Sequence, residues 1–158
     1  MTGDDTYGYH YTGYHKNPNN SRSNVNIMAT EGNFIDRELI KLYVPKLKSV
    51  LGSLGLIHNN TIYSFQSMWG QLYRKSLGGA IDVHNHYSHP RDLLSWVHFV
   101  KVPEQKCFYF YINDEKIYPD TQGSSDMIFY PSYANHGVDV LENDEDRFVV
   151  AGNISQIN

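Results

Sequence analysis

The sequence predicts a mainly β fold, a jelly roll braced by one N-terminal helix. Three observations lead to this prediction. The chain of 158 residues has the size of a single domain with its own core. Its aromatic content of 14%, carried mainly by 13 tyrosines, favours strands. After residue 61 the apolar pattern changes from a helical period to a run of short strand-like segments, and strands without interleaved helices pack as a sandwich or a barrel.

The first 30 residues differ in composition from the rest of the chain. They are rich in Gly, Asn, Ser and Tyr, and the segment Tyr-Gly-Tyr-His at 7–10 is loosely repeated at 12–15. Such a composition predicts a flexible or surface-draped arm over residues 1–30. In the alternative interpretation, its tyrosines fold over the active site or over a partner subunit. The folded domain is therefore expected at residues 31–158.

Residues 34–56 have the spacing of an amphipathic helix. Apolar residues recur there every three or four positions, at Leu39, Ile40, Tyr43, Leu47, Val50 and Leu51. Pro45 lies inside this pattern and is expected to kink or split the helix. Gly52 and Gly55 are expected to end it. We expect the helix to brace a sheet rather than to carry function.

The rest of the chain predicts a run of strands separated by turn-forming residues. The strands are expected at residues 62–72, 80–86, 95–102, 107–112, 116–118, 127–130, 137–141 and 148–154. The segments between them contain residues that favour turns, at Gly78-Gly79, Pro103-Glu104, Asn113-Asp114, Gln122-Gly123-Ser124 and Asn143-Asp144.

Composition argues against several classes of partner. The net charge of −4 and the pI near 6.0 do not provide the basic surface that nucleic-acid binding requires. No apolar run is long enough for a membrane helix, and the polar N-terminus does not resemble a secretory signal. The single cysteine, Cys107, allows no internal disulfide and suits a reducing compartment. A cytoplasmic location is therefore expected.

Histidines provide the candidate metal ligands. Three of them fall within the seven residues HNHYSHP, at 84–90. His84 and His86 are one residue apart, so a strand would place both on the same face, where they could bind one ion. Neutral imidazole is a good ligand for iron, zinc or copper. His136 is the candidate third ligand, because it lies between two predicted strands and can return to the same end of a jelly roll.

Arg147 is the candidate anion-binding residue. It begins the apolar strand that follows the acidic segment 142–146. An arginine that faces the interior is costly unless it meets an anion, and a guanidinium can form a bidentate pair with a carboxylate.

The order of these motifs resembles that of the 2-oxoglutarate- and Fe(II)-dependent oxygenases, and in particular of a small uncharacterised subgroup with a His-x-His…His…Arg pattern. The matching stretches lie between residues 67 and 153, over half the chain: Trp69, Gly78-Gly79, His84-Asn85-His86, 95–104, 127–140 and 144–153. The resemblance implies a double-stranded β-helix fold. It also implies that His84 is the first iron ligand, that His136 is the distal iron ligand, and that Arg147 pairs with the far carboxylate of 2-oxoglutarate.

The sequence leaves the remaining metal ligand open. Many members of the family carry Asp or Glu two residues after the first histidine, where this chain has His86. Either His86 is a ligand, giving a three-histidine site, or the carboxylate comes from Asp92 or is absent. His89, which precedes Pro90, could instead be the counterpart of a His-Pro pair in the subgroup.

The resemblance implies an oxidoreductase that uses Fe(II) and 2-oxoglutarate, hydroxylates a small-molecule or peptide substrate, and releases succinate and CO2. Two alternatives stay open. One is a cupin-like metalloprotein with three histidine ligands, no dependence on 2-oxoglutarate and a tolerance for loss of Arg147. The other is a non-catalytic jelly-roll binding protein that holds no stoichiometric metal. Neither nucleic acid nor membrane is expected as a partner, and exchange of the N-terminal arm would give a homodimer.

Overall fold

The computed structural model describes residues 21–26, 34–58, 60–75 and 80–157, which form one helix and two antiparallel sheets. The helix is α3 (Phe34–Ser53), and the strands are β1 (Ser21–Asn26), β2 (Tyr63–Tyr73), β3 (Ile81–His84), β4 (Asp92–Lys101), β5 (Phe108–Ile112), β6 (Glu115–Ile117), β7 (Met127–Pro131), β8 (His136–Val138) and β9 (Arg147–Gln156). The major sheet has the order β1-β2-β9-β4-β7, and the minor sheet has the order β3-β8-β5-β6. The predicted jelly roll is confirmed.

Each strand expected from the sequence corresponds to one of β2 to β9, with ends shifted by up to three residues. The three long strands β2, β9 and β4 lie side by side in the major sheet, with β9 in the middle. Alternate residues of β9 face opposite sides of this sheet: Val149 and Ala151 belong to the core between the sheets, whereas Val150 and Ile154 face the helix. The two-residue period that predicted the strands therefore reflects two apolar environments, one on each face.

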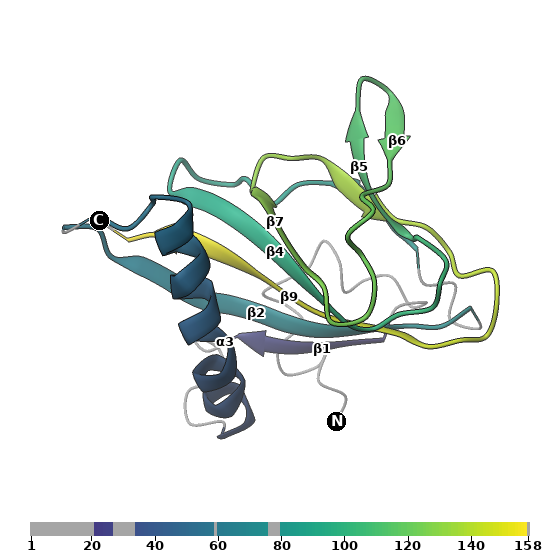
Figure 1. Ribbon diagram of the computed structural model, residues 1–158, viewed down its shortest axis with the longest axis horizontal. Coiled ribbons are helices and arrows are strands. Elements are labelled where there is room, and N and C mark those ends of the chain that lie inside the picture. The colour runs from purple at the N-terminus through teal and green to yellow at the C-terminus, as the bar shows by residue number, and fades with distance from the viewer. Residues whose placement is uncertain (1–20, 27–33, 59, 76–79, 158) are drawn as a thin grey trace.

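Helix α3 lies across one face of the major sheet (Figure 1). Tyr43, Leu47 and Leu51 are buried there against side chains of the sheet. Pro45 lies inside the helix, which is not split there and runs from Phe34 to Ser53. A proline costs about 3 kcal/mol in a helix interior, but burial of each large apolar side chain contributes about 1.5–3 kcal/mol. Contacts on both sides of Pro45 can therefore hold the helix together. Gly55, with φ of +68°, follows the helix end as predicted.

Residues 21–26, which fall within the predicted N-terminal arm, form the edge strand β1. They pair antiparallel with β2, from Ser21 opposite Leu72 to Asn26 opposite Ser67. Residues 1–20 and 27–30 of the arm lie outside the described residues. The division of the chain at residue 30 stays a prediction.

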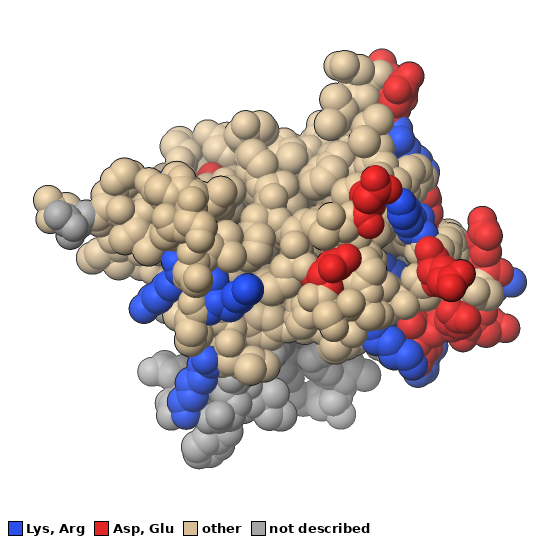
Figure 2. Space-filling model, viewed as in Figure 1, with Lys and Arg blue, Asp and Glu red and all other residues tan. Residues whose placement is uncertain are grey.

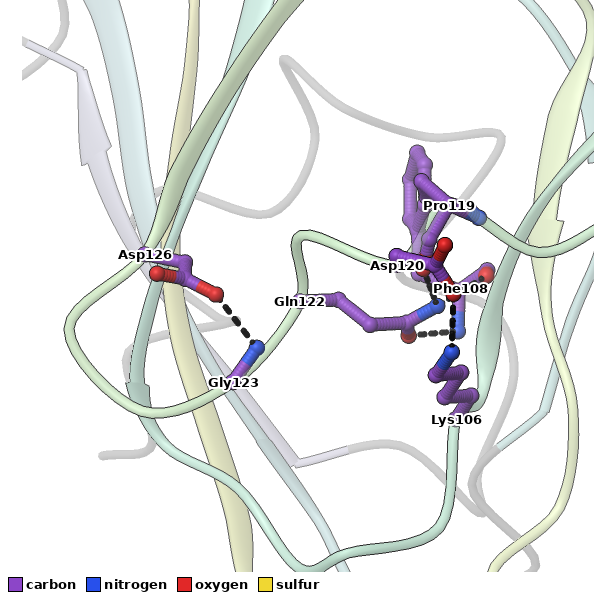
Figure 3. A network of polar contacts seen from close by, with 7 residues as sticks. All are labelled: Lys106, Phe108, Pro119, Asp120, Gln122, Gly123 and Asp126. Atoms are coloured by element: carbon purple, nitrogen blue, oxygen red, sulfur yellow. Dashed lines mark hydrogen bonds and ion pairs between the residues drawn. The ribbon is translucent and has the colours of Figure 1, made fainter.

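The long connection between β6 and β7 is attached to β5 by one buried glutamine. Gln122 Oε1 accepts a hydrogen bond from Phe108 N at 3.0 Å, and its Nε2 donates to the carbonyl oxygens of Phe108 and Pro119 at 3.1 and 2.8 Å (Figure 3). The ion pair between Lys106 and Asp120 lies beside this amide. Gln122 therefore supplies Phe108 with the backbone hydrogen bonds that a neighbouring strand would otherwise make. The centre of the Phe108 ring lies 5.6 Å from that of His136.

Charge is unevenly distributed over the surface. Acidic side chains gather at the end of the molecule where the β8–β9 connection lies, a segment that carries Glu142, Asp144, Glu145 and Asp146 (Figure 2). Basic side chains lie on helix α3 at the opposite side of the view. No helix in the described ranges is both long and apolar enough to span a bilayer.

We predict that Gln122→Ala lowers the free energy of unfolding by about 1–3 kcal/mol, because it leaves the buried amide and carbonyl of Phe108 without their partner. The measurement is urea-induced unfolding of wild type and variant. Gln105→Ala is the matched control, since the Gln105 amide also bonds to two backbone groups but at an exposed position. Equal losses for the two variants would contradict the structural role of Gln122.

Candidate metal centre

His84, His86 and His136 meet at one end of the minor sheet. One ring nitrogen from each lies within 4.8 Å of the other two. The antiparallel register of β3 and β8 places His84 directly opposite His136, and their ring centroids are 4.3 Å apart. His86 lies two residues beyond β3, where its backbone N–H donates to Ser132 O at 2.9 Å. Its ring lies 5.1 Å from that of His84 and 5.0 Å from that of His136.

Backbone carbonyls fix which nitrogen two of these rings present. His84 Nδ1 lies 2.7 Å from Asp82 O, and His136 Nδ1 lies 2.9 Å from Ala134 O. A carbonyl oxygen only accepts, so each Nδ1 carries the proton and each Nε2 keeps its lone pair. Metal-binding histidines commonly have this second contact, which sets both tautomer and ring orientation. Two imidazoles of the cluster are therefore held in the form that binds a metal ion.

Burial keeps His136 uncharged. Only 4% of the residue is exposed. Desolvation, with a smaller contribution from repulsion by His84, lowers the pKa of His136 to about 3. The ring is therefore neutral at physiological pH, and a metal ion has no proton to displace from it.

Gly137 allows the ligand strand to pass close to β5 and β3. A Cβ at this position would lie 2.6 Å from Tyr109 Cζ and 2.9 Å from Ile81 O. Both distances are far below ordinary contact, and one of the two atoms belongs to the backbone. Any larger residue at 137 would push β8 away from its neighbours and carry the adjacent His136 with it.

The structure does not bring His89 or Asp92 to the three histidines. Burial alone would raise the pKa of Asp92, but hydrogen bonds from Ser88, His89 and Ser155 lower it. Those bonds occupy both carboxylate oxygens and close the turn that follows the cluster. His89 Nδ1 accepts from the backbone N–H of Arg91 at 3.1 Å. Of the alternatives that the sequence left open, only His86 lies with His84 and His136 among the described residues.

Arg147 reaches the same pocket from the major sheet. It is 2% exposed, and neither Nη1 nor Nη2 has a hydrogen-bond partner among the described residues. Its guanidinium lies 4.6 Å from the ring centre of Tyr73 and 5.5 Å from that of Phe99. A buried cation without a hydrogen-bonding partner is costly. Two guanidinium donors of this arginine are therefore unused among the described residues that surround it.

The pocket lies between the two sheets and has an empty volume of about 410 Å³, part of it open to solvent. The described residues that line it are Trp69, Gln71, Tyr73, Ile81, His84, His86, Val97, Phe108, Tyr130, His136, Val138, Arg147, Val149 and Ala151. None of these is acidic. The interior therefore combines neutral metal-binding donors, one buried cation and apolar walls, which suits a metal ion together with an organic anion.

Two polar residues of the pocket were missed in the sequence. Gln71 is 3% exposed and lies on β2 between Trp69 and Tyr73. Tyr130 is 5% exposed, and its hydroxyl lies 3.2 Å from His136 Nε2. The signal for Gln71 was its place in the two-residue alternation, which puts its polar side chain on the inner face. No comparable signal separates Tyr130 from the other aromatic residues of the predicted strands.

Comparison with solved structures gives the same fold. Similar structures include an oxidoreductase of the 2OG-Fe(II) oxygenase family from Burkholderia pseudomallei, with TM-score 0.51 and 15% identity over 70% of this chain and 57% of that one. A prolyl-4-hydroxylase from Pseudomonas putida matches with a TM-score of 0.55 and 13% identity, over 82% of this chain and 70% of that one. HygX from Streptomyces hygroscopicus, with nickel and 2-oxoglutarate bound, matches with a TM-score of 0.59 and 10% identity, over 86% of this chain and 69% of that one. No family model and no curated protein matches the chain.

These likenesses show that the chain has the double-stranded β-helix fold of the 2-oxoglutarate- and Fe(II)-dependent oxygenases, the family that its motif order resembles. The chain spans between 57% and 70% of the length of these three structures. At 10–15% identity the comparison concerns the fold. The chemistry of this chain has to be argued from its own residues.

The buried neutral state of His136 predicts that the metal-free protein loses stability in mild acid. The folded pKa near 3 lies below the ordinary value of 6.5, so between these values only the unfolded chain takes up the proton. Stability is therefore present above pH 6.5 and falls as the pH decreases, by about 2 kcal/mol between pH 7 and pH 5. Denaturant unfolding in EDTA at both values measures the difference.

His136→Asn should remove most of this particular decrease. His98→Asn is the control, because burial also lowers the pKa of His98 but that ring lies under helix α3, bonded to Tyr43. An equal pH dependence in wild type and His136→Asn would contradict the assignment.

The geometry also predicts which of the candidate third ligands matters. His86→Ala should weaken Zn(II) or Co(II) binding at least about tenfold, because it removes one of three donors. Asp92→Asn should keep one metal ion per chain and lower the free energy of unfolding by about 1–3 kcal/mol, because it disturbs the turn. Equilibrium dialysis with metal analysis, beside urea unfolding, tests both. Loss of metal in Asp92→Asn with full binding in His86→Ala would reverse the assignment.

Proposed function

We propose that the protein is an Fe(II)- and 2-oxoglutarate-dependent dioxygenase, in which oxidation of an organic substrate accompanies decarboxylation of 2-oxoglutarate to succinate and CO2. One observation carries the proposal. The buried guanidinium of Arg147, whose Nη atoms have no hydrogen-bond partner among the described residues, opens into the same pocket as the three histidines. A metal site alone needs no buried cation beside it, whereas a site for a metal-chelating acid does.

The residues of the pocket fit both an iron ion and 2-oxoglutarate. His84, His86 and His136 would hold the iron, which when bound supplies the oxygen chemistry of the reaction. Arg147 would hold the far carboxylate of 2-oxoglutarate by two parallel hydrogen bonds. The histidines come from the minor sheet and the segment that follows β3, whereas the arginine comes from the major sheet. The cosubstrate would therefore lie between the two sheets.

The register of the major sheet connects the two ends of this proposed cosubstrate site. Tyr73 lies opposite Arg147, Gln71 opposite Val149, and Trp69 opposite Ala151. The Trp69 ring in turn lies 5.6 Å from that of His86. A row of inward-facing side chains thus runs from the guanidinium to the histidines.

Buried, largely apolar side chains surround this row. Trp69, Tyr73, Phe108 and Val149 are all buried and line the pocket. Apolar surroundings of low dielectric constant strengthen the attraction between the guanidinium and a carboxylate. They also protect a reactive oxidant from side reactions with solvent. The walls therefore serve both the binding and the chemistry that we propose.

We propose a small molecule or a peptide as the substrate. Tyr87 and Tyr133, which are 48% and 67% exposed, follow His86 and precede His136, so both lie in the connections that carry these ligands. Asn85 Nδ2 donates to Asn135 Oδ1 at 2.9 Å and joins the two connections. Among the similar structures, a prolyl hydroxylase from Trichoplax adhaerens is in complex with a peptide fragment, and HygX was also solved with hygromycin B bound. A cytoplasmic location and a homodimer remain part of the proposal.

A second candidate is a cupin-like metalloprotein that does not use 2-oxoglutarate. The composition of the donor set favours it: His84, His86 and His136 are three imidazoles, and no carboxylate joins them among the described residues. This candidate gives no role to Arg147. A non-catalytic binding protein, the third candidate, gives no role to the histidine cluster either.

The test is an anaerobic titration of metal-free protein with Fe(II) and then with 2-oxoglutarate. We expect the visible charge-transfer band of an iron–keto acid chelate in wild type, and a loss of 2-oxoglutarate affinity of about 30-fold or more in Arg147→Met, since the variant removes one partner of a buried charged pair. Met fills similar space without a charge. Because it also removes a costly buried cation, the variant should be at least as stable as wild type in the absence of ligand.

Arg74→Ala is the matched control. Arg74 is exposed and pairs with Asp146 on the surface, so this variant should keep the band and the affinity. Metal binding without a band would favour the cupin-like candidate. Absence of metal binding would favour the binding protein, and either result would overturn the dioxygenase proposal.

A further inference from the structure

We propose that the side-chain amide of Gln71 is a second binding group for the far carboxylate of 2-oxoglutarate, to which its Nε2 donates a hydrogen bond beside the guanidinium of Arg147. The inference rests on the proposed function and deepens it, because it concerns how the pocket would hold the cosubstrate. Gln71 lies on strand β2 of the major sheet, outside the motif pattern.

The place of Gln71 in its strand directs the side chain into the pocket. Successive residues of β2 face opposite sides of the sheet: Met68 packs with the side chains under helix α3, whereas Trp69 and Tyr73 belong to the core between the sheets. Gln71 lies between Trp69 and Tyr73 in this alternation. It is 3% exposed and lines the same pocket as the two aromatic residues.

The amide of Gln71 is unused in the structure. No hydrogen bond joins it to another described residue. Gln122, which is also buried, uses both ends of its amide on backbone groups. Buried polar groups normally have such partners, because the loss of their hydrogen bonds to water is costly. Packing alone would be served as well by an apolar side chain of similar size, so the amide is explained better by a ligand in the pocket.

The register of the sheet brings this amide toward the guanidinium. Tyr73 lies opposite Arg147 and Gln71 lies opposite Val149, so Gln71 and Arg147 are diagonal neighbours on the inner face. Diagonal neighbours on adjacent strands are about 7–8 Å apart, within the reach of long side chains. The guanidinium also lies 4.6 Å from the ring centre of Tyr73, the residue next to Gln71 on that face. A single carboxylate could therefore accept hydrogen bonds from both groups.

The chemistry of a carboxylate gives the reason for a second donor. Its two oxygens offer about four acceptor sites, and a guanidinium fork fills two of them. On β9 the next inward residues after the arginine, Val149 and Ala151, are apolar. On β4, the other neighbour of β9, the inward residues Val97 and Phe99 are apolar as well. Gln71 therefore supplies from β2 a donor that β9 and β4 lack, and it does so without adding a second charge.

The first test is the affinity of the full chain for 2-oxoglutarate, followed by the charge-transfer band of the Fe(II)-loaded protein under argon. Gln71→Met keeps the size of the side chain and removes the donor. We expect it to weaken 2-oxoglutarate binding about tenfold or more, as for loss of a hydrogen bond to a charged group, with the amount of bound iron unchanged. Gln105→Met is the matched control, since Gln105 is bonded to backbone groups at an exposed position outside the pocket, and this variant should keep the affinity.

The second test separates contact with the carboxylate from a packing role. In Gln71→Glu the new carboxylate would itself pair with Arg147, so urea unfolding of the metal-free and ligand-free variant should show at least the stability of wild type. The same variant should lose 2-oxoglutarate affinity about 100-fold or more, because two carboxylates would repel each other at one guanidinium. A glutamine that only packs predicts the opposite change in stability, since a buried carboxylate without a partner is costly.

Two results would overturn the inference and leave the proposed function standing. One is wild-type affinity for 2-oxoglutarate in Gln71→Met. The other is a Gln71→Glu variant that is less stable than wild type without ligand, in a protein whose wild type binds 2-oxoglutarate. A wild type that binds iron but no 2-oxoglutarate would overturn both the inference and the proposed function.

Discussion

The pairing of β3 with β8 is the constraint on which the site depends. His84 lies opposite His136 in this pairing, which shifts its register between Ile81 and His84, and a further slip of one residue would turn one of the rings to the other face of the sheet. Gly137 permits the close packing that this register needs. The hydrogen bond between Asn85 and Asn135 then joins the connections that follow and precede the paired histidines. The metal-binding geometry is thus a property of the minor sheet, set before any ion is bound.

Electrostatics in the pocket work against stability and in favour of binding. Arg147 is buried with two guanidinium nitrogens that have no hydrogen-bond partner among the described residues, and His136 is kept neutral by desolvation. Aromatic faces of Tyr73 and Phe99 offset part of the cost of the cation. Protein interiors rarely retain such groups without a compensating partner. An anionic ligand would pair with Arg147, and a metal ion would bind His136. The buried arginine and the neutral histidine are therefore more informative together than either is alone.

The strands could be predicted because each long strand of the major sheet separates two apolar environments, and the alternation of Val149, Val150 and Ala151 records this directly in the sequence. The helix was predicted as well, but its continuity through Pro45 could not be, because a local rule on proline takes no account of packing on both sides of it. The role of Asp92 could not be predicted, since its hydrogen bonds to Ser88 and Ser155 depend on a turn and on a strand far along the chain. Tyr130 was missed for a related reason: only the packing of the two sheets brings its hydroxyl to His136.

The two halves of the pocket belong to different sheets, and this division has an evolutionary consequence. The histidine pair of β3 and β8 is built by the minor sheet, whereas Arg147, Tyr73 and Gln71 stand on adjacent strands of the major sheet. Substitutions on β2 and β9 can therefore reshape the wall around Arg147 without altering the pairing that aligns His84 with His136. A protein of the proposed kind could in this way exchange its organic ligand over time and keep the histidine geometry that would hold its metal ion.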